Sequence, residues 1–134
     1  MSPVHETKLL IRESHLDTFG HVNNATYLEI FEEVRWDIIT ERGYGLAEIR
    51  KQKLGPVILE INLKFKKEVT LRENVTIRTW VTKHEKKITT MRQVILNEKG
   101  EEACIADFVI SLFDLKERKL VEPTPEWKKA LALP

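Results

Sequence analysis

The amino-acid sequence predicts an α+β fold in which one long central helix is wrapped by a curved antiparallel sheet of about five strands. A segment in the first third of the chain has apolar residues at helical spacing, and the residues after 56 alternate with a period of two. Successive strands beside a segregated helix are typical of α+β folds. With 134 residues, 42% of them hydrophobic, we expect a single domain spanning residues 1–134.

Residues 25–42 carry the clearest helical pattern in the chain. One apolar face is formed at i, i+4 and i+7 spacing by Tyr27, Phe31, Val34 and Ile38. Asn23 or Asn24 is suited to cap the start of this helix, and Gly43 is suited to end it. A short second helix is expected over residues 46–52.

Five segments have strand character. They are residues 8–14, before the long helix, and then 57–66, 74–83, 87–96 and 103–115. The last has apolar residues on both faces, which predicts a central strand, and Asn97 to Gly100 reads as a hairpin turn before it. An open sheet with one helix leaves edges exposed, so we expect dimerisation.

Composition and charge exclude several classes of function. The 22 basic and 21 acidic residues give a net charge of +1, which argues against a nucleic-acid or membrane-surface binder. Cys104 is the only cysteine, as expected in a reducing compartment. The sequence has neither a signal-peptide pattern nor an apolar run long enough to span a membrane, so the expected location is the cytoplasm.

The stretch SHLDTFGHVNNATY, residues 14–27, concentrates polar residues between the first strand and the long helix. Asp17 is either a turn residue or, beside a helix N-terminus that can polarise a carbonyl, a nucleophile or general base for acyl transfer. Gly20 permits a tight turn or a close backbone approach to a ligand. His21 is either structural or an acid/base group, and Asn23 and Asn24 either cap the helix or point into a pocket.

Other motifs contribute little. His15 and His21 lack further ligands at zinc spacing, and no phosphate loop, dinucleotide motif or CxxC pattern is present, so we expect no metal and no cofactor. Glu32 and Arg35 are three residues apart on the helix and are predicted to form a surface ion pair.

The segment HLDTFGHVNNATYLEIFEEVRWDII resembles the D-x-x-G-H-V-N-N-x-x-Y-x-x-x-F-E-x-x-R signature of hotdog-fold acyl-CoA thioesterases of the 4-hydroxybenzoyl-CoA thioesterase type. The matching positions are Asp17, Gly20, His21, Val22, Asn23, Asn24, Tyr27, Phe31, Glu32 and Arg35. The later segment GPVILEINLKFKKEVTLRENVTI is similar to the second strand of that family and the turn after it. The resemblance extends over residues 5–125.

This resemblance implies a hotdog fold that forms homodimers, often paired into homotetramers, with the active site at the dimer interface. It implies that Asp17 is the catalytic carboxylate, either as a nucleophile or as a base that activates water. A backbone amide near Asn24 would polarise the thioester carbonyl, and Gly20 would keep its approach open. The substrate-binding set that we predict is His21, Asn23, Tyr27 and Phe31, with Lys64, Lys66 and Lys67 for the phosphates of CoA.

The sequence departs from the family at one position, since many relatives carry a second Asp where His15 stands. Two alternatives to an acyl-CoA thioesterase remain, and the departure supports the first. One is a non-catalytic module that binds acyl thioesters. The other is a thioesterase acting on acyl carrier protein, which would need a basic docking patch, for which the candidates are Lys64, Lys66, Lys67, Lys86 and Lys87.

Overall fold

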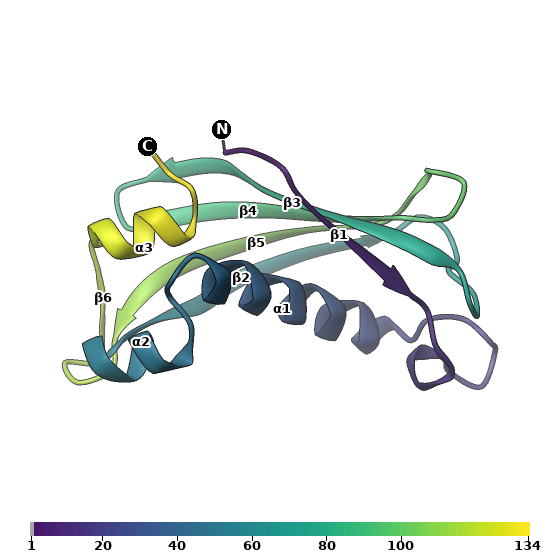
Figure 1. Cartoon of the computed structure of the whole chain (residues 1–134), viewed down its shortest axis with the longest axis horizontal. Helices are drawn as coiled ribbons and strands as arrows, with labels where there is room; N and C mark the ends of the chain where they lie inside the picture. The colour runs from purple at the N-terminus through teal and green to yellow at the C-terminus, as the bar shows by residue number, and fades with distance from the viewer. Residues whose placement is uncertain (1) are drawn as a thin grey trace.

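The computed structural model describes residues 2–134, and in it an antiparallel sheet curves over one long helix, α1 (Figure 1). The elements, in chain order, are β1 His5–Leu10, the 3-10 helix η1 Glu13–His15, α1 Asn24–Glu41, α2 Leu46–Gln52, β2 Leu54–Phe65, β3 Asn74–Glu85, β4 Ile88–Leu96, β5 Glu102–Asp114, β6 Lys119–Val121 and α3 Pro125–Ala130. The predicted α+β fold is confirmed.

The sheet has the strand order β1-β3-β4-β5-β2, and the short β6 pairs with the end of β5. The prediction of a central last strand is confirmed, because β5 pairs with β4 on one side and with β2 on the other. β2 follows α1 and α2 in the chain, and it lies at the edge of the sheet opposite β1. Within residues 2–134 its other side has no strand partner.

Two strand boundaries differ from the prediction. The first strand was expected over residues 8–14, but β1 ends at Leu10 and η1 follows, because pairing with β3 stops at Leu10 opposite Asn74. β2 begins at Leu54, before the Gly55-Pro56 pair that was expected to precede it. Pro56 is tolerated there because β2 is an edge strand, where a missing N–H removes no ladder bond.

α1 starts and stops where local chemistry dictates. Asn23 is the N-cap, and its side-chain Oδ1 accepts a hydrogen bond from the Ala25 amide at 2.9 Å. Arg42 is the C-cap, and its Nη1 donates to the Ala130 carbonyl at 3.0 Å, which fastens the end of α1 to α3. None of the helices in residues 2–134 combines the length and apolar character that a membrane crossing needs.

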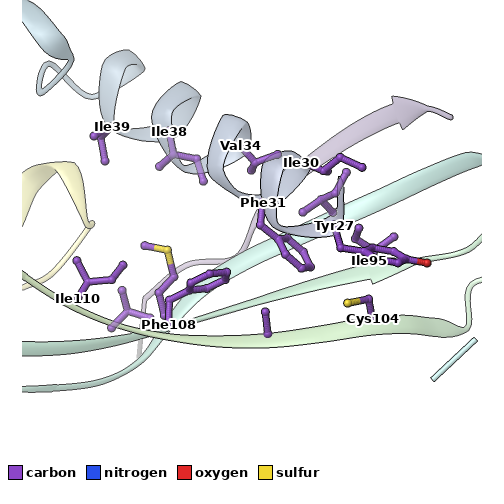
Figure 2. Close-up of a cluster of buried hydrophobic side chains, with 14 of the residues drawn as sticks. Tyr27, Ile30, Phe31, Val34, Ile38, Ile39, Ile95, Cys104, Phe108 and Ile110 are labelled. Carbon is purple, nitrogen blue, oxygen red and sulfur yellow. The ribbon is translucent and has the colours of Figure 1, made fainter. Parts of the chain in front are cut away.

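The core lies between the buried face of α1 and the inner face of the sheet, and Figure 2 shows side chains from both meeting there. Phe31 is 0% exposed and meets Phe108 of β5 edge-on, with ring centroids 6.0 Å apart. Cys104 also lies in this core, where burial raises the pKa of its thiol to about 12. The thiol is therefore protonated at neutral pH and serves packing rather than nucleophilic chemistry.

Replacing Phe31 with Ala should lower the free energy of unfolding by about 3–5 kcal/mol, because the change removes a fully buried ring and leaves a cavity. Urea titration followed by circular dichroism measures this change. Phe19→Ala is the matched control, since Phe19 is 81% exposed and its removal should cost little. Similar losses in the two variants would contradict the placement of Phe31.

Asn23→Ala should lower the free energy of unfolding by about 1 kcal/mol, because the first turn of α1 loses its side-chain cap. Asn24→Ala is the control, because Asn24 is the first helical residue and its exposed side chain does not cap. A thermal or urea titration that ranks the two variants in the opposite order would show that the cap is misassigned.

Candidate active site

The loop between η1 and α1 folds around the backbone and side chain of Asp17. Its amide donates to the His21 carbonyl at 2.9 Å, and the Gly20 amide donates to the Asp17 carbonyl at 3.2 Å. The carboxylate Oδ1 accepts from the amides of Phe19 at 2.8 Å and His21 at 3.3 Å. Gly20 has φ +81°, a conformation that favours glycine. The second carboxylate oxygen accepts no hydrogen bond from residues 2–134.

The N-terminus of α1 lies beside this loop. The Asn23 amide donates to the His15 carbonyl at 3.2 Å. His15, where the sequence departs from the family, is therefore in direct backbone contact with the N-cap residue of α1. The His15 ring itself is engaged locally, because its Nδ1 accepts from the Arg12 amide at 2.9 Å. The Asn24 amide donates to no acceptor among residues 2–134, and it carries the partial positive charge of the helix start.

A cavity of about 270 Å³ brings these groups together. From the loop and α1 it is lined by Asp17, His21, Asn24 and Tyr27, and from the end of β2 by Phe65. The rings of Tyr27 and Phe65 pack with centroids 5.5 Å apart. Burial raises the pKa of Tyr27 to about 12, so its hydroxyl is neutral at physiological pH. Asp17, with one carboxylate oxygen free of hydrogen bonds, and Asn24, whose amide has no acceptor among residues 2–134, therefore line the same cavity.

The lysines predicted for CoA phosphates are not all at the cavity, because Lys66 and Lys67 follow the end of β2 whereas Lys64 lies within it. Lys66 and Lys67 line the cavity, and each forms an ion pair, with Glu102 at 3.6 Å and Glu101 at 3.0 Å. Lys64 lies on the opposite face, because it alternates with Phe65 along the strand.

Three further predicted residues lie outside the cavity lining. Gly20 and Asn23 shape the loop and the cap, whereas Phe31 is in the core. Sequence reasoning missed Phe65 and Glu68. Glu68 is 3.2 Å from His21 Nε2, and a β-bridge joins His21 to Thr70. The apolar alternation of β2 was the only sequence signal for Phe65. No local pattern predicts that the segment after β2 packs against His21.

The predicted surface pair of Glu32 and Arg35 is wrong. Arg35 reaches under α1 to the sheet, where its Nη1 donates to Gln93 Oε1 at 2.9 Å. Its guanidinium stacks over the Phe108 ring, 4.1 Å from the centroid. The side chain of Arg35 is long enough to leave the surface, and an acceptor on β4 with an aromatic face on β5 holds it there.

Comparison with known proteins shows the family of the chain. The profile of the thioesterase-like superfamily matches residues 11–131. The chain is 31% identical over 128 residues to the long-chain acyl-CoA thioesterase FadM of Escherichia coli K12, covering 94% of this chain and 96% of FadM.

Solved structures share the fold. The DHNA-CoA thioesterase of Staphylococcus aureus superposes with a TM-score of 0.83 at 26% identity, over 95% of this chain and 87% of that one. SAV2348 of the same organism, solved in complex with CoA, superposes with a TM-score of 0.90 at 15% identity, over 100% and 88% of the two chains. The chain therefore adopts the hotdog fold and belongs to the thioesterase-like superfamily.

Proposed function

We propose that this protein hydrolyses an acyl-CoA thioester to a free carboxylic acid and CoA. The observation that carries the proposal is that Asp17, with an unbonded carboxylate oxygen, and Asn24, with an unbonded backbone amide, line the same cavity. Membership of the thioesterase-like superfamily and the similarity to FadM support it. The motif shared with the 4-hydroxybenzoyl-CoA thioesterase type supports the same chemistry without fixing the acyl group.

The chemistry can follow either of two routes. As a nucleophile, Asp17 attacks the thioester carbonyl, the C–S bond breaks, the CoA thiolate leaves and takes a proton, and water hydrolyses the resulting anhydride. As a base, Asp17 takes a proton from a water molecule that attacks the carbonyl directly. In both routes the carbonyl oxygen gains negative charge, which the Asn24 amide at the helix start stabilises.

The remaining assignments follow from position. Lys66 and Lys67 flank the cavity and meet the phosphates of CoA, exchanging their present carboxylate partners for them. His21, held by Glu68, braces the loop at the mouth of the cavity. The ring of Tyr27 contacts the start of the acyl group beside Phe65.

Acyl carrier protein is a less suitable carrier. The basic docking patch predicted for it would join Lys64, Lys66 and Lys67 to Lys86 and Lys87. The Lys66 amide bonds to Ala103 and the Lys87 carbonyl to Ser111, positions that lie at opposite ends of β5. Ala103 and Ser111 are eight positions apart on β5, about 26 Å, so these lysines form two separate groups.

We further propose that the protein is a homodimer in which β2 pairs with the β2 of a second copy, and that two such dimers can form a homotetramer. β2 is 12 residues long, and on the face toward α1 it exposes apolar side chains, with Ile58 39%, Ile61 44% and Phe65 50% exposed. A long edge strand with an exposed apolar face is normally covered. A second copy related by a twofold axis satisfies both the open edge and this face.

Asp17→Asn should lower kcat/KM for acyl-CoA by at least about 100-fold, because the amide lacks a basic or nucleophilic oxygen. The amide oxygen can still accept from Phe19, so the loop should be preserved. Release of CoA thiol from a panel of acyl-CoA substrates measures the change, and Asp37→Asn on the exposed side of α1 is the matched control.

Equal activity of wild type and Asp17→Asn would remove Asp17 from the mechanism. A wild type that is thermally stabilised by CoA thioesters but turns none of them over would instead identify the non-catalytic binding module.

Ile61→Lys should convert the dimer to a monomer in sedimentation velocity, because it places a charge in the centre of the apolar face of β2. Asn62→Lys is the matched control, since its side chain lies on the other face of the same strand. A wild-type monomer, or an Ile61→Lys variant that stays dimeric, would show that β2 is not the interface.

A further inference from the structure

A second cavity, of about 140 Å³, lies between α1, β2 and α3, at the end of α1 away from Asp17. Its walls are mainly apolar, and the side chains that matter here are Trp36, Ile39, Ile58, Met91 and Trp127. A dry apolar cavity of about 150 Å³ holds a benzene-sized group. Two charged residues of α1, Glu32 and Arg35, also line it, which a cavity for a plain hydrocarbon does not require.

Arg35 has more hydrogen-bond donors than its surroundings have acceptors for them. The guanidinium has five N–H donors, and Gln93 Oε1 takes one of them at 2.9 Å. No carboxylate oxygen of residues 2–134 lies within 4.0 Å of it. Every fully buried side-chain nitrogen and oxygen in the described chain has a partner. Arg35 Nε and Nη2 have none, so they are not fully buried, and Arg35 is one of the residues that line the cavity. Burial lowers the pKa of Arg35 to about 10 while Glu32 raises it, and the guanidinium stays charged at neutral pH.

An apolar track connects the two cavities. Phe65 lines the candidate active site, Ile58 lines the second cavity, and Ile61 lies between them on the same face of β2, so in the proposed dimer the track runs between this face and the second copy. Arg35 follows Asn24 by eleven residues on α1, a distance of about 17 Å along the helix axis. An extended chain advances about 1.2 Å per bond, so about 14 bonds bridge this distance.

We propose that the second cavity binds the distal end of a long aliphatic acyl chain that carries a hydroxyl group, and that Arg35 donates a hydrogen bond to that hydroxyl oxygen. The proposal rests on the proposed thioesterase function and names its substrate class. A hydroxyl suits the cavity better than a carboxylate, because Glu32 lines the same space and repels an anion but can accept a hydrogen bond from the hydroxyl.

The test compares kcat/KM for myristoyl-CoA, ω-hydroxymyristoyl-CoA and the ω-carboxyl analogue, with the same three forms at chain lengths from octanoyl to palmitoyl. Wild type should prefer the hydroxylated chain over the plain chain by about 10-fold or more near the myristoyl length, as a hydrogen bond to a charged group provides. Arg35→Met should abolish this preference, and Arg35→Lys should retain part of it. The ratio is measured on one sample, so a loss of folded protein cancels.

Arg118→Met is the matched control, because Arg118 also stacks on a phenylalanine, Phe113, but in an exposed turn. It should keep the wild-type preference. Equal turnover of plain and hydroxylated chains at every length would overturn the proposal, as would a preference that survives Arg35→Met. A preference for the carboxyl analogue over the hydroxylated chain would also overturn it.

Calorimetric binding of free ω-hydroxymyristate and myristate to Asp17→Asn separates this inference from the proposed function. Tighter binding of the hydroxylated acid, lost on adding Arg35→Met, supports the cavity assignment even if no acyl-CoA is hydrolysed. Equal binding of the two acids rejects the cavity assignment, even where hydrolysis of acyl-CoA upholds the thioesterase.

Discussion

The packing of α1 against the inner face of the sheet determines where every other group in the molecule lies. Phe31 and Phe108 meet at the middle of this contact, and both are almost completely buried. Because protein interiors are close-packed, the helix has little freedom to slide or rotate on the sheet. Its first turn is therefore held beside the Asp17 loop, and an amide that would otherwise face water is available to a ligand.

A polar network supports this contact from within. Gln93 donates from Nε2 to the Phe31 carbonyl and to Thr79 Oγ1, each at 3.1 Å, while its Oε1 accepts from Arg35. A buried amide is costly unless its partners are present, and here all of them are. The network ties α1 to two strands at fixed positions, so apolar packing and hydrogen bonding specify the same placement of the helix.

The features that sequence predicted are those encoded locally. The bounds of α1 follow from its apolar period and the Asn23 cap, and the Asp17 loop follows from the spacing of Asp17 and Gly20 within the motif. Features that depend on distant pairing escaped prediction. Arg35 leaves the helix surface because Gln93 and Phe108 lie opposite it on the sheet. The spacing of Arg35 from Glu32 along the helix cannot predict these contacts. The identity of the acyl group likewise depends on side chains from three elements that meet only after folding.

The position of β2 has a consequence for how the chain is made. β2 pairs only with β5 in the described part of the chain. Gly55 therefore cannot pair until its partner Phe113, 58 residues later in the chain, has been synthesised. Pairings so far apart in sequence form slowly, because the intervening loop must first be closed. While the chain emerges from the ribosome, the apolar strand that borders the candidate site remains without a neighbour until almost all of the protein exists. The sheet is therefore completed late, after nearly the whole chain has been synthesised.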